Sequence, residues 1–278
     1  MRKVVFFDID GTLVMKNGRI PESTKRAIES LKKENITPVL STGRAPAMIH
    51  KISQELAIYD YISMNGQYVV MDGEVIYDNP IDRDTLHQFS NFTKEQDDGY
   101  IFCGSEEIFA GKTINPHSSR YKVLKQLRKF VPSRLQQSYL KRSMKIHPDP
   151  VAYTDKNIYQ AILQTSFFNE EKYAAQFPML RFTKSNAYLF DVINHHVSKA
   201  TGVKQVLDYL GTTVDQSIAF GDHLNDLEML KYVKTGIAMG NAMADTKQVA
   251  DKVTAPVNKD GIYRALVELE LIPQVAVK

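Results

Sequence analysis

The first apolar run of the chain is Val4-Val5-Phe6-Phe7-Asp8-Ile9-Asp10-Gly11-Thr12-Leu13, and it ends in two carboxylates and a turn. Its first four residues are β-branched or aromatic and uncharged, which is typical of a strand buried on both faces. Asp8 and Asp10 lie two residues apart, so their side chains point to the same side if strand geometry continues through them. Two like charges at the end of a buried strand are unfavourable unless a cation lies between them. The pattern favours a nucleophilic aspartate beside a magnesium site over a solvated turn with incidental aspartates.

Strands and helices alternate in the first and last parts of the chain. Such alternation indicates a mostly parallel sheet that is covered by helices on both faces. Apolar residues at helical spacing predict helices, and short apolar runs between them predict strands. The predicted helices cover residues 20–31, 49–56 and 203–210, and the predicted strands cover residues 4–7, 36–40, 61–64, 217–220, 236–240 and 252–254.

The middle of the chain has a different pattern. Asp72-Gly73 separates two short strands, over 67–71 and 74–77, and is a strong hairpin signal. Beyond it, helices and antiparallel strands are segregated, which predicts an α+β insert. The insert is expected to contain helices near 84–96 and 120–129 and strands within 99–110, 159–167, 180–182 and 187–193.

These patterns together predict an α/β protein with a doubly wound, mostly parallel sheet and a second, inserted domain. The core domain is expected to comprise residues 1–80 and 190–278, and the inserted α+β domain residues 81–189. A sheet domain that is interrupted by an insert explains why the two ends of the chain share one pattern. This arrangement explains the pattern better than two tandem domains do.

The bulk composition excludes several classes of protein. The 278 residues carry a net charge of +3 and no block of five or more like charges, so no nucleic-acid partner is indicated. Cys103 is the only cysteine, so no intramolecular disulfide forms. No apolar run reaches the roughly 18 residues of a membrane helix. Because a core strand begins at Val4, no signal peptide is expected, and the predicted location is the cytoplasm.

Polar side chains follow three of the predicted strands. Asp8 and Asp10 end the first, Thr42 and Gly43 follow the second, and Asp222 follows the strand over 217–220. In open parallel sheets, ligands bind beyond the carboxyl ends of the strands, so these clusters are expected to converge. Lys199, at the start of a predicted helix, is a further candidate for the same crevice.

Four short motifs resemble those of the haloacid dehalogenase superfamily, in the order and spacing of its Cof-type phosphatases. Those phosphatases carry a large α/β cap (the class IIB type) between the second and third motifs, which corresponds to the predicted insert. The resemblance covers the whole chain, including the tail Asn258-Lys259-Asp260-Gly261-Ile262. The motifs are Asp8-Ile9-Asp10-Gly11-Thr12, Thr42-Gly43-Arg44, Lys199 and Gly221-Asp222-His223-Leu224-Asn225-Asp226.

The resemblance implies a Mg²⁺-dependent phosphatase that hydrolyses small-molecule phosphate monoesters through an aspartyl-phosphate. Asp8 is the implied nucleophile, and Asp10 the general acid that protonates the leaving alcohol and then the base for the hydrolytic water. The implied metal ligands are Asp8, Asp222 and the backbone carbonyl of Asp10. Asp226 is expected to hold waters or position its neighbours.

The resemblance also implies a phosphate cradle and a partner. The cradle consists of the Lys199 ammonium, the Thr42 hydroxyl, the backbone amides of Ile9 and Gly43, and Asn225. The partner is a small phosphorylated metabolite, either a sugar phosphate or a phosphorylated cofactor, which the cap selects. The expected oligomeric state is a monomer or a weak homodimer. A phosphomutase and a non-catalytic phosphometabolite sensor are the alternatives, and a sensor needs neither nucleophile nor acid.

Several of these residues also have a structural interpretation. Lys199 by itself reads as a solvated surface lysine, and Thr42 and Asp226 as helix caps. Asn65-Gly66 is either a turn or a substrate contact.

The remaining polar candidates are weaker. Arg44 contacts either the substrate or a structural ion-pair partner, and His223 faces either the loop exterior or the substrate. His195 and His196 are not expected to bind a metal, because adjacent side chains diverge and no third ligand lies nearby.

Overall fold

The structure is a computed structural model, and it describes residues 2–96, 98–110, 145–147, 153, 155–165, 170–186 and 189–274. The chain forms two compact units. The first comprises Met1–Gly43, His50–Asp78 and Ser198–Lys278, and the second Arg44–Ile49 and Asn79–Val197.

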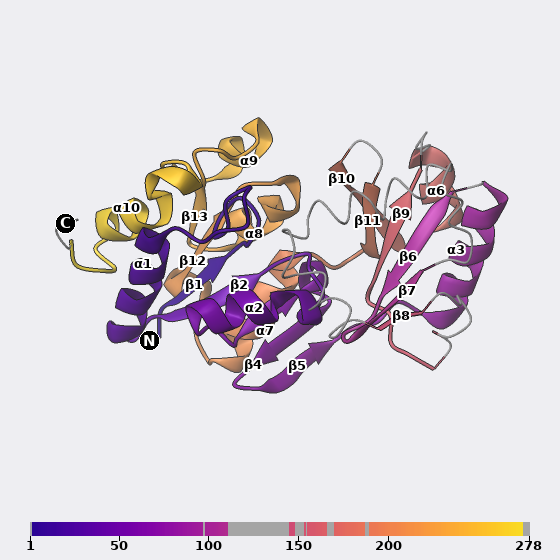
Figure 1. The fold of residues 1–278 in the computed structure, drawn as a ribbon, viewed down its shortest axis with the longest axis horizontal. Coiled ribbons are helices and arrows are strands. Elements are labelled where there is room, and N and C mark those ends of the chain that lie inside the picture. The colour runs from indigo at the N-terminus through magenta and orange to yellow at the C-terminus, as the bar shows by residue number, and fades with distance from the viewer. Residues whose placement is uncertain are drawn as a thin grey trace. The chain divides into compact units, whose positions relative to one another are not determined.

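The first unit is built on an eight-stranded sheet in the order β14-β13-β12-β1-β2-β3-β4-β5 (Figure 1). The strands from β14 to β3 are parallel, and β3, β4 and β5 are antiparallel. Asp72 and Gly73 join β4 to β5 with φ angles of 50° and 82°, the left-handed pair of a tight hairpin. The strands are β1 (Val4–Phe7), β2 (Thr37–Ser41), β3 (Tyr61–Ser63), β4 (Tyr68–Met71), β5 (Glu74–Asp78), β12 (Ser217–Gly221), β13 (Thr235–Ala238) and β14 (Lys252–Val253).

Helices cover both faces of this sheet, which confirms the doubly wound prediction. All four residues of β1 are fully buried, and alternate ones serve opposite faces. Val4 and Phe6 belong to the core cluster beneath α7 and α8, while Phe7 stacks on Phe220 at a ring separation of 5.2 Å. The helices are α1 (Glu22–Lys33), α2 (Pro46–Leu56), α7 (Lys199–Tyr209), α8 (Leu227–Tyr232), α9 (Ala244–Val249) and α10 (Gly261–Glu268).

The second unit is an α+β domain, as predicted. Its six-stranded sheet has the order β10-β11-β9-β6-β7-β8 and is antiparallel except for β7 and β8. Phe89 of α3 is fully buried and lies at the centre of an aromatic core that includes residues of α6 and the strands. The elements are α3 (Arg83–Glu95), β6 (Gly99–Cys103), β7 (Glu107–Ala110), β8 (Lys145–His147), β9 (Gln160–Gln164), α6 (Glu170–Gln176), β10 (Leu180–Asn186) and β11 (Leu189–Asn194).

A few predicted elements differ from the structure. The strand predicted over 61–64 ends at Ser63, and Met64 instead begins a 3-10 turn over Met64–Gly66 with a left-handed φ of 48°. Helices α6, α9 and α10 were not predicted, because six to eight residues are too few for a helical period to stand out. The helix predicted near 120–129 lies outside the described residues.

The composition also led to expectations about Cys103 and about membrane-spanning helices. Cys103 is buried in β6, and burial raises the pKa of its thiol to about 12, so it is the small apolar residue that was expected. None of the helices in the described ranges has both the length and the apolar character needed to cross a bilayer.

Candidate functional site

The strand order brings three of the predicted clusters together. Strand β1 lies between β12 and β2, and all three are parallel, so their carboxyl ends adjoin (Figure 1). Asp8, Thr42 and Asp222 each follow directly on one of these ends. The first strand ends at Phe7, so strand geometry does not continue through the two aspartates. Asp8 is buried, whereas Asp10 is exposed and forms an isolated bridge with Val14.

Lys199 joins two carboxylates at this edge. Its side chain is fully buried, and its Nζ lies 2.6 Å from Asp8 Oδ1 and 2.6 Å from Asp226 Oδ1. Burial disfavours the ammonium, but the carboxylates of Asp226 and Asp8 outweigh this effect and raise the pKa of Lys199. The interpretation of Lys199 as a solvated surface residue is therefore wrong.

Asp226 holds the loop that carries Asp222. It is fully buried, and while Oδ1 accepts from Lys199, Oδ2 accepts the backbone N–H groups of Asp222 and His223 at 2.9 and 3.0 Å. Although Asp226 precedes α8, its side chain makes no capping hydrogen bond to that helix. The helix-cap interpretation is therefore wrong for α8, and the contacts are those of a residue that positions its neighbours.

Asp222 carries the atom that is most in need of a cation. Its Oδ1 is buried and accepts no hydrogen bond from any residue that the structure describes. Burial, together with the neighbouring Asp226 carboxylate, raises the pKa of Asp222 to about 7. On the other side, a Cβ at Gly11 would lie 2.1 Å from Asp222 Oδ2, so only glycine leaves room for this carboxylate.

The carboxylates of Asp8, Asp222 and Asp226 form an acidic cluster in which a metal ion such as magnesium could be held. One oxygen from each lies within 4.8 Å of the others, the only such group of potential ligands in the described part of the chain. Burial raises the pKa of Asp8 well above its usual value; the Lys199 ammonium opposes the rise, and the two other carboxylates add to it. A hard cation among oxygen ligands relieves this repulsion, and the unpaired Asp222 oxygen is available to it.

Apart from Lys199, the residues of the predicted phosphate cradle lie in segments that follow strands at the carboxyl edge of the sheet. Ile9 comes after β1, Thr42 and Gly43 come after β2, and Asn225 lies in the turn after β12. Thr42 is buried, and its N–H donates to the Ile62 carbonyl at 2.9 Å. No backbone hydrogen bond from the N–H groups of Ile9 and Gly43 is found among the described residues; Ile9 is fully buried and Gly43 is partly buried. Asn225 Nδ2 donates to Asn65 Oδ1 at 2.9 Å.

Asn241 is a site residue that was not predicted. Its Nδ2 donates to the Gly11 carbonyl at 2.9 Å and lies 3.3 Å from Asp222 Oδ2, while its Oδ1 accepts the N–H of Val257. It follows Gly240, just beyond strand β13. The same signal that identified Thr42, a polar residue after the end of a parallel strand, also marks this position.

His195, His196, His223 and Arg44 are the remaining polar candidates. His195 and His196 are exposed and face each other edge to face at 4.9 Å. His223 is partly buried, and burial lowers the pKa of its imidazole. The backbone N–H of His223, not the ring, donates to Asp226. Arg44 Nη1 lies 3.5 Å from the Met48 carbonyl. Whether His223 or Arg44 contacts substrate stays a prediction.

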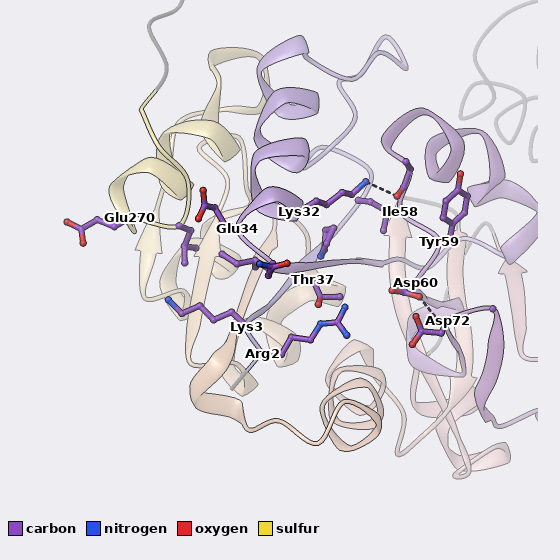
Figure 2. A pocket seen from close by; sticks show the side chains of 16 residues that line it. Arg2, Lys3, Lys32, Glu34, Thr37, Ile58, Tyr59, Asp60, Asp72 and Glu270 are labelled. Atoms are coloured by element: carbon purple, nitrogen blue, oxygen red, sulfur yellow. Dashed lines mark hydrogen bonds between the residues drawn. The ribbon is translucent and has the colours of Figure 1, made fainter.

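A large hollow lies at the opposite edge of the first unit, where β1, β2 and β3 begin (Figure 2). It has a volume of about 970 Å³, and none of the predicted site residues lines it. Its charged side chains are of both signs, and Lys32 donates to the carbonyls of Leu56 and Ala57, at 2.7 Å each. The charged lining residues are Arg2, Lys3, Lys32, Glu34, Asp60, Asp72 and Glu270.

Comparisons with known proteins identify the relatives of this chain. The model of the haloacid dehalogenase-like hydrolase family matches residues 5–266. "Putative phosphatase YkrA" of Bacillus subtilis (strain 168) is 36% identical over 270 residues, which are 97% of this chain and 98% of that protein. The 5-amino-6-(5-phospho-D-ribitylamino)uracil phosphatase YitU of the same organism is 26% identical over 280 residues, 95% of this chain and 96% of its own length.

Solved structures that resemble this chain include a phosphatase of the haloacid dehalogenase group. The crystal structure of a hypothetical protein from Geobacillus kaustophilus HTA426 is 36% identical and superposes with a TM-score of 0.85, covering 98% of this chain and 100% of that one. The haloacid dehalogenase subclass IIB sugar phosphatase BT4131 is 26% identical, with a TM-score of 0.82, covering 97% of this chain and 100% of that one.

Proposed function

The chain belongs to the haloacid dehalogenase-like hydrolase family and is a phosphatase, and we propose that it hydrolyses phosphate monoesters of small metabolites through an aspartyl-phosphate on Asp8. One observation carries the mechanism. The buried carboxylate of Asp8 is paired with Lys199 and lies within 4.8 Å of a second carboxylate, Asp222, whose Oδ1 has no partner among the described residues. This arrangement suits a nucleophile that acts beside a cation.

In the first step, an oxygen of Asp8 attacks the phosphorus of the ester. A P–O bond to Asp8 forms as the P–O bond to the leaving alcohol breaks, and Asp10 donates the proton that the alkoxide takes up. The exposure of Asp10 supports this role, because an exposed carboxyl can reach the substrate and exchange protons with water.

In the second step, Asp10 takes a proton from a water molecule, and that water attacks the phosphorus of the aspartyl-phosphate. The bond between phosphorus and Asp8 breaks, inorganic phosphate leaves, and the carboxylate of Asp8 is regenerated. The two carboxylates thus have separate roles, which agrees with one being buried and paired and the other exposed.

We propose that Asp8, Asp222 and the backbone carbonyl of Asp10 hold the magnesium ion. The bound ion supplies positive charge that lets an anionic nucleophile approach an anionic phosphate. Asp226 orients this set by holding the loop of Asp222 through two backbone N–H groups and by fixing Lys199. Its two oxygens are already engaged, which supports a positioning role over direct metal binding.

The phosphoryl oxygens are bound by Lys199, the Thr42 hydroxyl, the amides of Ile9 and Gly43, and Asn225. Phosphoryl transfer depends mostly on positioning and electrostatic stabilisation, so donors fixed before the reaction lower its barrier. The burial of Lys199 and Thr42 supports such fixed donors, because buried side chains have little freedom to reorient.

We propose that the α+β unit is the cap that selects the leaving group. The relative YitU is named for a phosphorylated ribitylaminouracil and BT4131 for sugar phosphates, so small phosphorylated sugars and cofactors are the proposed substrate class. A cap excludes bulk water from the reaction and contacts the part of the substrate that distinguishes one ester from another.

The test is a panel of sugar phosphates and phosphorylated cofactors with magnesium, in which released inorganic phosphate is measured. Asp8→Asn should lower turnover about a thousandfold or more, since the nucleophile is lost. Asp215→Asn is the matched control, because Asp215 has a side chain that is 75% exposed and precedes the amino end of β12.

Four results would contradict parts of this proposal. Phosphate release that survives Asp8→Asn excludes Asp8 as nucleophile, and activity that survives a strong chelator excludes the metal. An isomeric phosphate as the product identifies a phosphomutase. Tight binding of phosphate esters with no turnover identifies a sensor.

A further inference from the structure

The turn after β3 has an unusual backbone. Met64, Asn65 and Gly66 have φ angles of 48°, 56° and 101°, so three consecutive residues are left-handed. Glycine adopts this conformation freely and asparagine tolerates it, but methionine does so only where its surroundings require it. All three residues are buried. A strained segment that persists in a buried position is a reason to ask what it holds in place.

Asn65 links two of the segments that are proposed to bind phosphate. Its N–H donates to the Thr42 carbonyl at 3.0 Å, and its Oδ1 accepts from Asn225 Nδ2 at 2.9 Å. Asn65 as a whole residue is only 3% exposed. It also packs against Gly43, where an added Cβ would lie 3.1 Å from both carboxamide atoms of Asn65.

Gly66 extends the same turn to a third segment. A Cβ at Gly66 would lie 2.0 Å from the Ser198 carbonyl and 3.3 Å from the Lys199 nitrogen. The turn therefore rests directly against the start of α7, where Lys199 begins the helix. One short turn contacts the segments of Thr42, Lys199 and Asn225, which come from distant parts of the sequence.

We propose that Asn65 is a positioning residue for the phosphatase reaction, which orients the Asn225 carboxamide and the backbone after Thr42 for the phosphoryl group. The inference rests on the proposed function of Asn225. A carboxamide rotates over a broad torsional range, so a free Asn225 samples many orientations. The hydrogen bond to Asn65 holds one of its two N–H donors and leaves the other for the ligand.

The test separates Asn65 from Asn225 by a double-mutant cycle of Asn65→Gly, Asn225→Ala and both together. Glycine keeps the left-handed backbone and removes only the carboxamide. Asn65→Gly should lower kcat/KM about tenfold, as expected for one hydrogen bond that organises a site. In the Asn225→Ala background the same change should alter kcat/KM less than about twofold, because Asn65 acts through Asn225.

A matched control and a structural measurement accompany the kinetics. Asn35 is also left-handed, with a φ of 57°, but is exposed beyond the end of α1, so Asn35→Gly should leave kcat/KM unchanged. In NMR, the Asn225 side-chain amide should be protected from solvent exchange in the wild type and in Asn65→Asp, which keeps an acceptor oxygen. In Asn65→Gly this protection should be lost.

Each outcome is decisive. Additive losses in the double-mutant cycle, or an unchanged kcat/KM in Asn65→Gly, overturn the positioning role. Should Asn65→Gly fail to fold, loss of Asn225 amide protection in Asn65→Asp also overturns it, because the acceptor is retained there. A wild-type protein that hydrolyses no phosphate ester contradicts the proposed function instead, while the amide measurement still reports whether Asn65 holds Asn225.

Discussion

The two edges of the parallel sheet in the first unit differ in how they handle charge. At the carboxyl edge, Lys199 and Asp226 are fully buried, Asp8 is nearly so, and the three form one connected group. At the amino edge, charges of both signs surround an open hollow of about 970 Å³. The hollow is large but contains none of the predicted site residues. We therefore base the proposed chemistry on the buried charges at the carboxyl edge and not on the size of the hollow.

The physical reason is the cost of burial. An ammonium or carboxylate loses several kcal/mol of hydration when it is buried, so it is retained only where specific partners compensate it. Lys32 at the amino edge is only partly buried and donates to the carbonyls of Leu56, the last residue of α2, and of Ala57, which is an ordinary structural role. Substituting matched residues at the two edges is a direct test of this difference.

The largest expected effect comes from replacing the two lysines by methionine. Lys199→Met leaves Asp8 and Asp226 buried without their cation, so the free energy of unfolding should fall by about 3–5 kcal/mol. Phosphate release should fall about a thousandfold or more. Lys32→Met removes only hydrogen bonds to carbonyls, and should cost about 1–2 kcal/mol with turnover within about twofold of wild type. For each variant, urea unfolding measures the free energy of unfolding, and released phosphate measures the turnover.

Equal effects of the two substitutions would break the comparison between the edges. In particular, a Lys199→Met protein as stable and active as Lys32→Met would mean that the buried group at the carboxyl edge is not a compensated charge network. The added variant Lys199→Arg keeps the charge but not the shape, so it should recover part of the stability and little of the activity.

The next effect is the response of thermal stability to magnesium. Because burial raises the pKa of Asp222 to about 7, the folded, metal-free protein keeps a proton that the unfolded chain releases at lower pH. Its stability should therefore fall as the pH rises from about 4 to about 7. Magnesium competes with that proton, so saturating ion should stabilise the protein more at pH 8 than at pH 5, by about 2–3 kcal/mol at a hundred times Kd.

Asp222→Asn should abolish this response, and Asp72→Asn at the amino edge should leave it intact. Calorimetric scans with and without magnesium at both pH values give the measurement. A magnesium response that is the same at pH 5 and pH 8, or that survives Asp222→Asn, would show that the ion binds elsewhere.

Much of the carboxyl edge could be predicted from local sequence. The apolar run before Asp8 indicates a buried strand, and polar residues after parallel strands belong to one edge whatever the order of those strands. Thr42 and Asp222 were found in this way, and Asn241, which has the same signal, was overlooked. The fold class follows from the same alternation of strands and helices, which persists even where single boundaries shift.

The contacts between distant segments could not be predicted. Nothing in the sequence around Lys199 indicates that its ammonium meets Asp226, since the pairing depends on how α7 packs against the sheet. The left-handed Met64 contradicts its own local preference, and only tertiary contacts hold it there. Short helices such as α9 carry too few residues for a periodic pattern, so packing alone reveals them.

The smallest expected effect comes from alanine substitutions at two left-handed glycines, one at each edge of the sheet. These two substitutions also give the sharpest comparison of the edges. Gly11 has a φ of 89° and Gly73 a φ of 82°, but a Cβ at Gly11 meets Asp222 at 2.1 Å, while a Cβ at Gly73 meets nothing within 4 Å. Gly73→Ala should cost about 1 kcal/mol, which is the backbone strain alone. Gly11→Ala should cost about 2 kcal/mol, because the Asp222 carboxylate must also move, and should weaken magnesium binding about tenfold. Equal losses in urea unfolding, with equal magnesium affinity, would mean that Gly11 serves the turn and not the carboxylate beside it.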